Sequence, residues 1–255
     1  IKGLTEEQIA VLTSVQIQGF SITNASALSI TQIAALSSSN ISGLESADLS
    51  RIATLAITGL ETAAIEQLSS VQVQGFTGAQ IAQLSSLQIQ ALNTAAIAGL
   101  LSSQIQALTP SNIVGLSSKQ VQALNTLGLT GLQSADLASI APEAIAGFSA
   151  SAIERFSATL VQSLVSDQIT QFSSAQVAAF TTLNIKGLES SDLAAITTHA
   201  IQGLEPEDLQ QLSSAQLQGL TPAQVLALST QQVQAFNSLN IQGLASSQVE
   251  AFSPA

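Results

Sequence analysis

The sequence predicts an all-α protein, a solenoid (superhelical rod) in which each eight-residue repeat forms one very short capped helix. Three observations lead to this fold class. The chain divides from Thr5 into 31 consecutive octads without insertion or deletion, most of them of the form S/T-x-x-Q-I-x-A/G-L. Two positions of the octad are always or almost always apolar. The other positions carry residues that are typical of the first and last residues of helices. An unbroken short repeat of this kind is typical of a stacked, quasi-one-dimensional architecture.

The two apolar positions require one helix break in each octad. We number octad positions from 1 to 8, with Thr5 at position 1. Position 8 is Leu, Phe or Ile in every octad, and position 5 is Ile, Val or Leu in every octad except the one that contains Ala25. A strand would send these positions to opposite faces, because their separation is odd. A continuous helix would rotate the apolar stripe by about 80° per octad. Short helices separated by corners are the remaining solution.

Positions 1 to 4 predict where each helix begins. Position 1 is mostly Ser, Thr or Asn and position 4 is mostly Gln, Asn or Asp, which together form a capping box. The position-8 residue and position 5 of the next octad then form a hydrophobic staple. Proline at position 2 would be the first helical residue, where a missing N–H costs nothing. All five prolines fall there: Pro110, Pro142, Pro206, Pro222 and Pro254.

Glycines predict where each helix ends and how the coils pack. Thirteen of the 15 glycines lie at position 7, where we expect a helix end with positive φ. A period of 56 residues also places a large apolar residue at position 3, four residues before a glycine on the same helix face. We expect each such pair to form a knob and a hole for a neighbouring coil. The pairs are Val15 with Gly19, Val71 with Gly75, Leu127 with Gly131, Leu183 with Gly187, and Leu239 with Gly243.

The 56-residue period and the glycine spacing predict the domain organisation. Seven octads in three coils would give about 2.3 repeats per coil. Residues 1–255 are expected to form one continuous array, with 31 full octads from 5 to 252 and super-repeats at 13–68, 69–124, 125–180, 181–236 and 237–255. Because the chain begins inside an octad at Ile1, we expect a processed product or a piece of a longer array.

Composition restricts the partners of the protein. The chain is 46% hydrophobic and only 8% charged, which is unlike a disordered segment. It has no cysteine, so disulfides and thiolate metal sites are excluded. The net charge of −11 argues against nucleic acid and anionic membranes as partners. No apolar run approaches the roughly 18 residues of a membrane span.

Few side chains are candidates for chemistry, so we predict no enzyme activity and no cofactor. His199 is the only histidine, and it lies at outward-facing position 3 without partners for a triad or a zinc site. Glu205, Glu207 and Asp208 form the densest acidic cluster and are a candidate for weak cation binding, although no calcium-loop motif accompanies them. At position 4 a carboxylate favours the helix N-terminus and closes the capping box. The position-4 acids are Asp48, Asp136, Asp192 and Asp208.

Two adjacent octads carry a resemblance to a known type of array. Residues 213–220 (S-S-A-Q-L-Q-G-L) and 221–228 (T-P-A-Q-V-L-A-L) resemble the T-T-x-Q-[IV]-x-A-L octapeptide arrays of very large secreted or surface proteins of Gram-negative bacteria, which are commonly described as adhesin-like or haem-utilisation-like. The resemblance covers the whole chain. It implies an extracellular or cell-surface stalk, fibre or matrix component.

These observations predict a structural, non-enzymatic extracellular protein that forms a rod, a stalk or a self-assembling filament, such as a surface fibre, a biofilm matrix component or an adhesin shaft. Its partner would be another copy of itself, because the Gln, Ser and Thr positions offer uncharged hydrogen bonds for end-to-end or lateral association. The alternative is a binding module that presents its repetitive surface to a glycan, a peptide or Ca²⁺.

Overall fold

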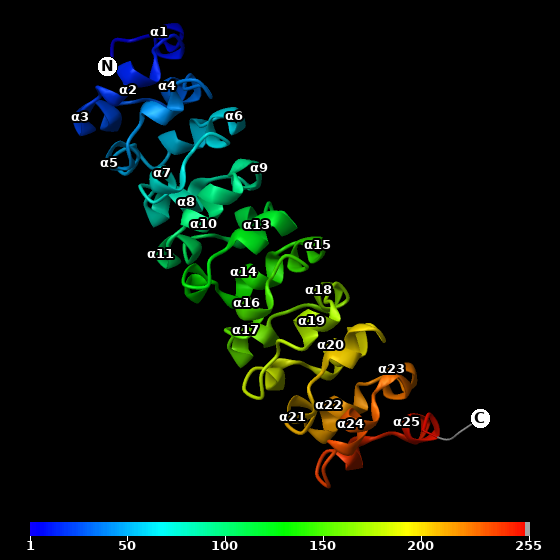
Figure 1. Ribbon diagram of the computed structural model, residues 1–255. Helices are drawn as coiled ribbons and strands as arrows, with labels where there is room; N and C mark the ends of the chain where they lie inside the picture. Colours follow the sequence, from blue (N-terminus) through cyan, green and yellow to red (C-terminus); the bar gives the residue numbers. More distant parts are fainter. Residues whose placement is uncertain (253–255) are drawn as a thin grey trace. The chain divides into compact units, whose positions relative to one another are not determined.

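Each octad forms one helix of one to two turns, as the repeat predicts (Figure 1). The computed structural model describes residues 1–252, and these contain short α-helices and 3-10 helices but no strand. The predicted all-α solenoid of short helices is therefore confirmed. Contacts divide the chain into two compact units, unit 1 (Ile1–Ile140) and unit 2, which begins at Ala141.

The helix bounds follow the octads in both units. Unit 1 contains α1 (Glu6–Ala10), α2 (Ser14–Gln18), α3 (Ile22–Ser26), α4 (Ile30–Ala34), η1 (Ile41–Gly43), α5 (Ser46–Leu49), η2 (Ala56–Gly59), α6 (Thr62–Ile65), α7 (Ser70–Val73), α8 (Gly78–Gln83), α9 (Ser86–Ala91), α10 (Thr94–Gly99), α11 (Ser102–Ile105), α12 (Pro110–Ile113), α13 (Ser118–Ala123), η3 (Gly128–Gly131) and α14 (Ser134–Ser139). Unit 2 contains α15 (Pro142–Ile145), α16 (Ala150–Ile153), α17 (Ala158–Gln162), α18 (Ser166–Ile169), α19 (Ser174–Val177), η4 (Ile185–Gly187), α20 (Ser190–Ala195), η5 (Ala200–Gly203), α21 (Pro206–Leu209), α22 (Ser214–Gln218), α23 (Pro222–Ala227), α24 (Thr230–Gln234), η6 (Ile241–Gly243) and α25 (Ser246–Glu250).

Many of the α-helices begin with the predicted capping box. At α13, the Ser117 N–H donates to Gln120 Oε1 at 2.9 Å, and the Gln120 N–H donates to Ser117 Oγ at 3.4 Å. Each reciprocal pair satisfies two N–H groups that the start of a helix leaves free. Four of the five prolines are the first residue of their helix, as predicted, namely those of α12, α15, α21 and α23. Pro254 lies outside the described residues.

Helices end without the predicted left-handed glycine. No described glycine has a positive φ, so this prediction is wrong. Two extended residues, at positions 8 and 1, turn the corner instead. Between α8 and α9, Leu84 has φ −62° and ψ 137°, and Ser85 has φ −72° and ψ 164°. Any residue adopts these angles, so the corner itself does not require glycine.

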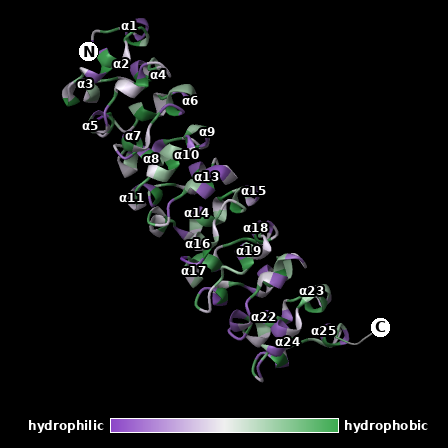
Figure 2. Ribbon diagram, viewed as in Figure 1, coloured by the Kyte–Doolittle hydropathy of each residue, from purple (hydrophilic) through white to green (hydrophobic). Residues whose placement is uncertain are grey.

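Positions 5 and 8 form the core of each unit, as predicted. Ile105 and Leu108 are 0% and 3% exposed, and Ala25, the exception at position 5, is also fully buried. Apolar and hydrophilic stretches alternate along the ribbon at the scale of single helices (Figure 2). A four- to six-residue helix is not stable alone in water, so its stability comes from burying these two side chains against neighbouring octads.

Each coil contains about three and a half octads. Every helix packs on the helix three octads away: in unit 1, α1 on α4 and α7 on α10; in unit 2, α16 on α19 and α20 on α22. Position-4 side chains reach the octad four earlier, through hydrogen bonds that span 28 and 31 residues. One superhelical turn therefore takes between three and four octads, which is about 28 residues. The predicted 2.3 octads per coil is wrong, and the 56-residue period spans two coils rather than three.

Glycine at position 7 is required by the approach of successive coils. A Cβ atom on Gly131 would lie 2.0 Å from the carbonyl oxygen of Ser102, and one on Gly203 would lie 2.0 Å from that of Ser174. In both pairs the serine is at position 2, three octads earlier. Glycine therefore provides room for the backbone of the coil beneath.

This contact replaces the predicted knobs and holes. Gly75, Gly131, Gly187 and Gly243 do lie against a neighbouring coil, but position-2 backbone occupies the space beside them. Gly19 has only atoms of its own helix nearby. The expected knobs lie outside the core, because they are between 64% and 80% exposed: Val15, Val71, Leu127, Leu183 and Leu239. The knob prediction is therefore wrong.

Gly131→Ala should lower the free energy of unfolding by about 2 kcal/mol or more, because the new methyl group overlaps backbone that cannot rotate away. Gly19→Ala is the matched control. It has the same octad position and no atom of another coil within 4 Å, so its effect should stay within about 0.5 kcal/mol. Urea unfolding of the two variants measures the difference. Equal losses of stability would show that coil spacing does not require glycine.

Candidate functional site

The most regular polar feature of the interior is a column of Gln and Asn side chains at position 4, which we call the amide ladder. Its members each donate to backbone of an octad that precedes them by four. In unit 1 they are Gln32, Asn40, Gln72, Gln80, Gln88, Gln104, Asn112 and Gln120. Members in unit 2 include Gln176, Asn184, Gln216, Gln224, Gln232, Asn240 and Gln248.

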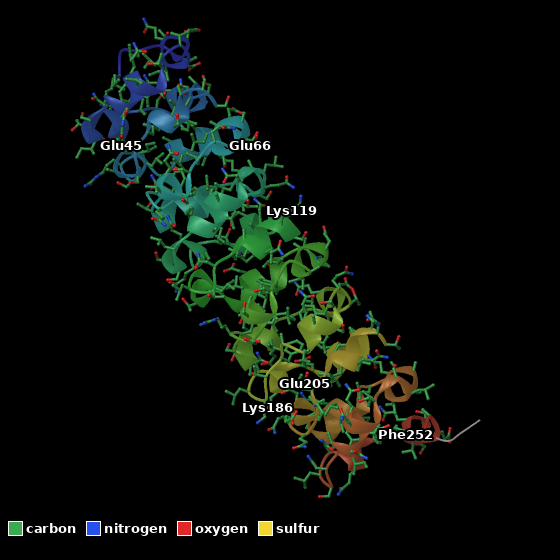
Figure 3. The ribbon with its side chains drawn as sticks, viewed as in Figure 1. Glu45, Glu66, Lys119, Lys186, Glu205 and Phe252 are labelled. Carbon is green, nitrogen blue, oxygen red and sulfur yellow. The ribbon has the colours of Figure 1, made fainter. Side chains whose placement is uncertain are left out.

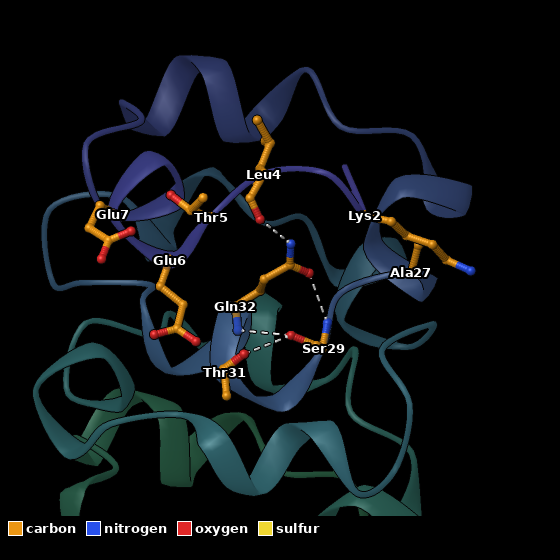
Figure 4. A pocket seen from close by; sticks show the side chains of 9 residues that line it. All are labelled: Lys2, Leu4, Thr5, Glu6, Glu7, Ala27, Ser29, Thr31 and Gln32. Carbon is orange, nitrogen blue, oxygen red and sulfur yellow. Dashed lines mark hydrogen bonds between the residues drawn. The ribbon is translucent and has the colours of Figure 1, made fainter.

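One ladder amide satisfies three backbone groups. Gln104 Oε1 accepts from the N–H of Leu101 at 3.0 Å, which caps its own helix. Its Nε2 donates to the carbonyl oxygens of Val73 and Phe76, both at 2.7 Å. Gln32, the first member of the ladder, makes corresponding bonds (Figure 4). Its Oε1 accepts from the N–H of Ser29 at 3.0 Å, and its Nε2 donates to the carbonyl oxygen of Leu4 at 2.8 Å. The side chain thus joins a helix start to the coil beneath.

The bond is needed because each corner isolates a carbonyl group. The position-8 N–H donates to the carbonyl of position 5, as Phe76 does to Val73 at 3.0 Å. The position-8 carbonyl has no such partner, because the chain leaves the helix there. A buried carbonyl without a partner costs about 1–3 kcal/mol. The ladder amide of the next coil removes this cost.

Position 4 is therefore mainly an interior position. Gln104 is 2% exposed and Gln80 is 1% exposed. The predicted capping role of this side chain is confirmed. In these octads the position-4 amides are not available for the predicted self-association, because they make hydrogen bonds within the unit. The hydrogen bond of the side-chain oxygen follows from capping within the octad. The carbonyl that accepts from the side-chain nitrogen lies 28 residues earlier, so the octad pattern does not reveal it.

Asparagine shows how a shorter side chain fits the same place. Asn112 Nδ2 donates to the carbonyls of Ile81 at 3.0 Å and Leu84 at 3.1 Å. Aspartate has the same length and shape but only acceptor oxygens when ionised. In four octads it replaces the amide, and all four side chains are at most 4% exposed: Asp48, Asp136, Asp192 and Asp208.

The ladder register predicts two backbone carbonyls, 28 and 31 residues earlier, as the neighbours of each aspartate. Asp48 accepts from the N–H of Glu45 at 3.2 Å, and Asp192 accepts from that of Glu189 at 2.9 Å, so at both sites the aspartate makes its own bond of the predicted capping box. At α14 and α21 no such box forms. Asp136 Oδ2 is buried and has no hydrogen-bond partner. An ionised carboxylate therefore cannot make the hydrogen bond that a ladder amide donates to the preceding coil.

Burial raises the pKa of all four carboxyl groups above the ordinary value. The largest of these shifts brings the pKa of Asp208 to about 6, first through burial and then through the negative charges of Glu205 and Glu207. These three acids are the predicted cation cluster. Among residues 1–252, no group of three or more His, Asp or Glu side chains is placed to hold a metal ion.

The remaining charged side chains lie at the surface of their units. Glu45, Glu66, Lys119 and Lys186 are exposed (Figure 3). His199 is exposed at the start of η5, as predicted. Within residues 1–252, no helix has both the length and the hydropathy needed to cross a membrane.

Comparison with known families identifies one similarity. A family model described as ALTTAQ repeat matches residues 201–238. No curated protein matches the chain. Within the matched residues, 219–224 read G-L-T-P-A-Q, which places the six letters of that description at octad positions 7, 8, 1, 2, 3 and 4. The match supports a structural repeat protein, and the resemblance to adhesin-like arrays stays a prediction.

Gln104→Ala should lower the free energy of unfolding by about 2–4 kcal/mol, because it removes three hydrogen bonds and leaves the Phe76 carbonyl unpaired. Gln106→Ala is the control, two residues away at exposed position 6 of the same octad. Its effect should stay within about 0.5 kcal/mol. Urea unfolding compares the two. Similar small losses would show that the ladder does not hold the coils together.

Asp208 should make the protein less stable as the pH rises. Its folded pKa of about 6 exceeds the ordinary 3.8, so its stabilising contribution is complete below about pH 3.8 and is lost as the pH rises through 6. Asp208→Asn restores the amide donor and should stabilise the protein at pH 7 by about 1–2 kcal/mol, with a smaller gain at pH 4.

Urea midpoints measured from pH 4 to pH 8 test this dependence, with exposed Asp167→Asn as the control for the same change of charge. The control should show no comparable gain between pH 4 and pH 7. A constant difference between the wild type and Asp208→Asn across this range would contradict the assignment.

Proposed function

We propose that this protein is a non-enzymatic structural component outside the bacterial cell, a stalk or fibre element of a surface protein or of a biofilm matrix. The amide ladder is the observation that carries the proposal. It uses the principal repeated polar side chain to bind each coil to the next through bonds shielded from water. Sliding one coil past another would break several of these bonds at once. Such resistance suits a spacer or scaffold under tension.

The surface also suits an extracellular location. Proteases require several residues of extended, accessible chain, which loops usually provide. Here a corner such as Leu84–Ser85 uses two extended residues between helices. The whole chain has only five Lys and Arg residues, so trypsin-like enzymes find few targets. Ser, Thr and Gln keep the surface polar while the charge density stays low.

Self-association is part of the proposal. A fibre or matrix component must contact further copies or further octads, and the solenoid offers the same type of surface at successive coils. The similarity to the ALTTAQ repeat between 201 and 238 supports a repeat protein, and the fibre role rests on the ladder.

Antibodies raised against residues 1–255 should label intact cells of the source organism or the material around them. Protease added outside unfixed cells should remove a surface-exposed control protein sooner than this antigen, because the compact corners resist cleavage. Labelling that appears only after permeabilisation would contradict an extracellular role. A cytoplasmic protein stained in parallel controls for leakage.

A further inference from the structure

A buried carboxyl oxygen in unit 1 has no hydrogen-bond partner. Asp136 lies at position 4 of octad 133–140 and is 2% exposed, and its Oδ2 atom makes no hydrogen bond. At the same octad position, Gln104 and Asn112 use a side-chain nitrogen to reach the preceding coil. Buried polar atoms in folded proteins nearly always have a partner, so this oxygen calls for a physical explanation.

The neighbour of this oxygen follows from the stacking of two octads. Gln133 Nε2 donates to the carbonyl oxygen of Gln106 at 2.8 Å, so octad 133–140 lies against octad 101–108. The ladder separation of 28 residues then makes the carbonyl oxygen of Leu108 the counterpart of Asp136. Leu108 is 3% exposed, and its carbonyl oxygen accepts no hydrogen bond from a described residue. The register therefore pairs two acceptors without a donor.

One proton would supply the missing donor. A neutral carboxyl group carries one O–H donor, whereas an ionised one has only acceptor oxygens. Aspartate has the length of asparagine, and Asn112 in the same ladder donates from Nδ2 to the carbonyl oxygen of Leu84 at 3.1 Å. A hydrogen on Asp136 Oδ2 would make the corresponding bond to Leu108. Loss of that proton leaves a charge and unpaired oxygens in the interior, which is unfavourable.

The surroundings of Asp136 favour its neutral form. Helix α12 packs against α14, and neither helix carries another titratable side chain. Between residues 101 and 142 the other charged side chain is Lys119, which is exposed. Burial alone raises the pKa of Asp136 above its ordinary value of 3.8. A buried carboxyl group without a cation beside it is stabilised in its neutral form.

We propose that Asp136 is a proton-binding site that closes the joint between octads 101–108 and 133–140. In the neutral form, Asp136 Oδ2 donates its hydrogen to the carbonyl oxygen of Leu108. In the ionised form this bond is absent, and the two coils are held together less firmly. The inference deepens the proposed structural function, on which its biological use rests: a scaffold in which acid strengthens the hold between these coils.

The direction of the pH effect follows from the raised pKa. The stabilising contribution of neutral Asp136 is complete below about pH 3.8 and is lost as the pH rises through the folded pKa. At Asp208 the negative charges of Glu205 and Glu207 add to the effect of burial. Asp136 has no such neighbours on its own helix or on α12, so it isolates the contribution of burial and of the bond.

Carbon-13 nuclear magnetic resonance of the labelled protein, titrated from about pH 3 to about pH 8, tests the bond itself. The carboxyl carbon of Asp136, whose signal Asp136→Asn removes, should titrate with a midpoint above 3.8. The carbonyl carbon of Leu108 should shift with the same midpoint, because it loses its donor in the same step. The carbonyl carbon of Phe76 is the control and should not shift, because Gln104 donates to it at every pH.

Two substitutions separate the donor from the shape of the side chain. Asp136→Asn carries a permanent donor, whereas Asp136→Ala has none and copies the position-4 alanine of other octads, such as Ala64 and Ala96. Urea midpoints over the same pH range compare the variants. The wild type should be more stable than Asp136→Ala at low pH and should lose this advantage as the pH rises. Asp136→Asn should exceed Asp136→Ala by a constant margin.

Either of two results would overturn the inference. A carboxyl carbon that titrates at the ordinary value would show that the fold does not hold a proton on Asp136. A raised midpoint without a matching shift of the Leu108 carbonyl carbon would show that burial acts without the bond. Both measurements use the purified protein, so their failure leaves the extracellular structural role to the cell-labelling result, and the two failures are distinguishable.

Discussion

The rest of this structure depends on the satisfaction of one carbonyl group at each corner. An eight-residue repeat cannot continue its helix, and the position-8 carbonyl that ends it lacks a helical partner. The ladder amide that supplies the partner comes from the octad four later, as Gln104 does for Phe76. This bond fixes how many octads fit in a coil. The spacing then requires glycine where two backbones meet, as at Gly131 and Ser102.

The amide ladder tolerates asparagine in place of glutamine, because asparagine keeps the amide donor. Aspartate weakens the ladder, because its carboxylate has no donor. Asparagine makes the same pair of bonds at Asn112. Aspartate keeps the shape but, when ionised, has no donor, and Asp136 Oδ2 is buried without a partner. Burial, followed by the negative charges of Glu205 and Glu207, raises the pKa of Asp208 to about 6. The four position-4 aspartates thus lie among octads in which position 4 is mostly Gln, Asn or Ala. They are the places where acidity can change how firmly neighbouring coils hold together.

The octad pattern predicts the features that form within one repeat. It does not predict which octads pack against each other. The apolar positions 5 and 8, the capping boxes and the helix-starting prolines each follow from interactions within about one repeat. The number of octads per coil depends on which octads touch, and a 56-residue period fits two coils or three. The sequence therefore predicts Leu127, beside Gly131, as a knob for a neighbouring coil, although its side chain is 77% exposed. The donor role of Gln104 was missed for the same reason, because its acceptors are distant in sequence.

Exchange of Gln side-chain amide protons with solvent, followed by nuclear magnetic resonance, tests the ladder most directly. Amide hydrogens held in buried hydrogen bonds exchange only when the structure opens. Gln104 Nε2 protons should therefore exchange far more slowly than those of Gln106, its exposed neighbour in the same octad. Slow exchange at Gln104 and fast exchange at Gln106 is the predicted result. Equally fast exchange at both would show that the position-4 amide does not join the coils.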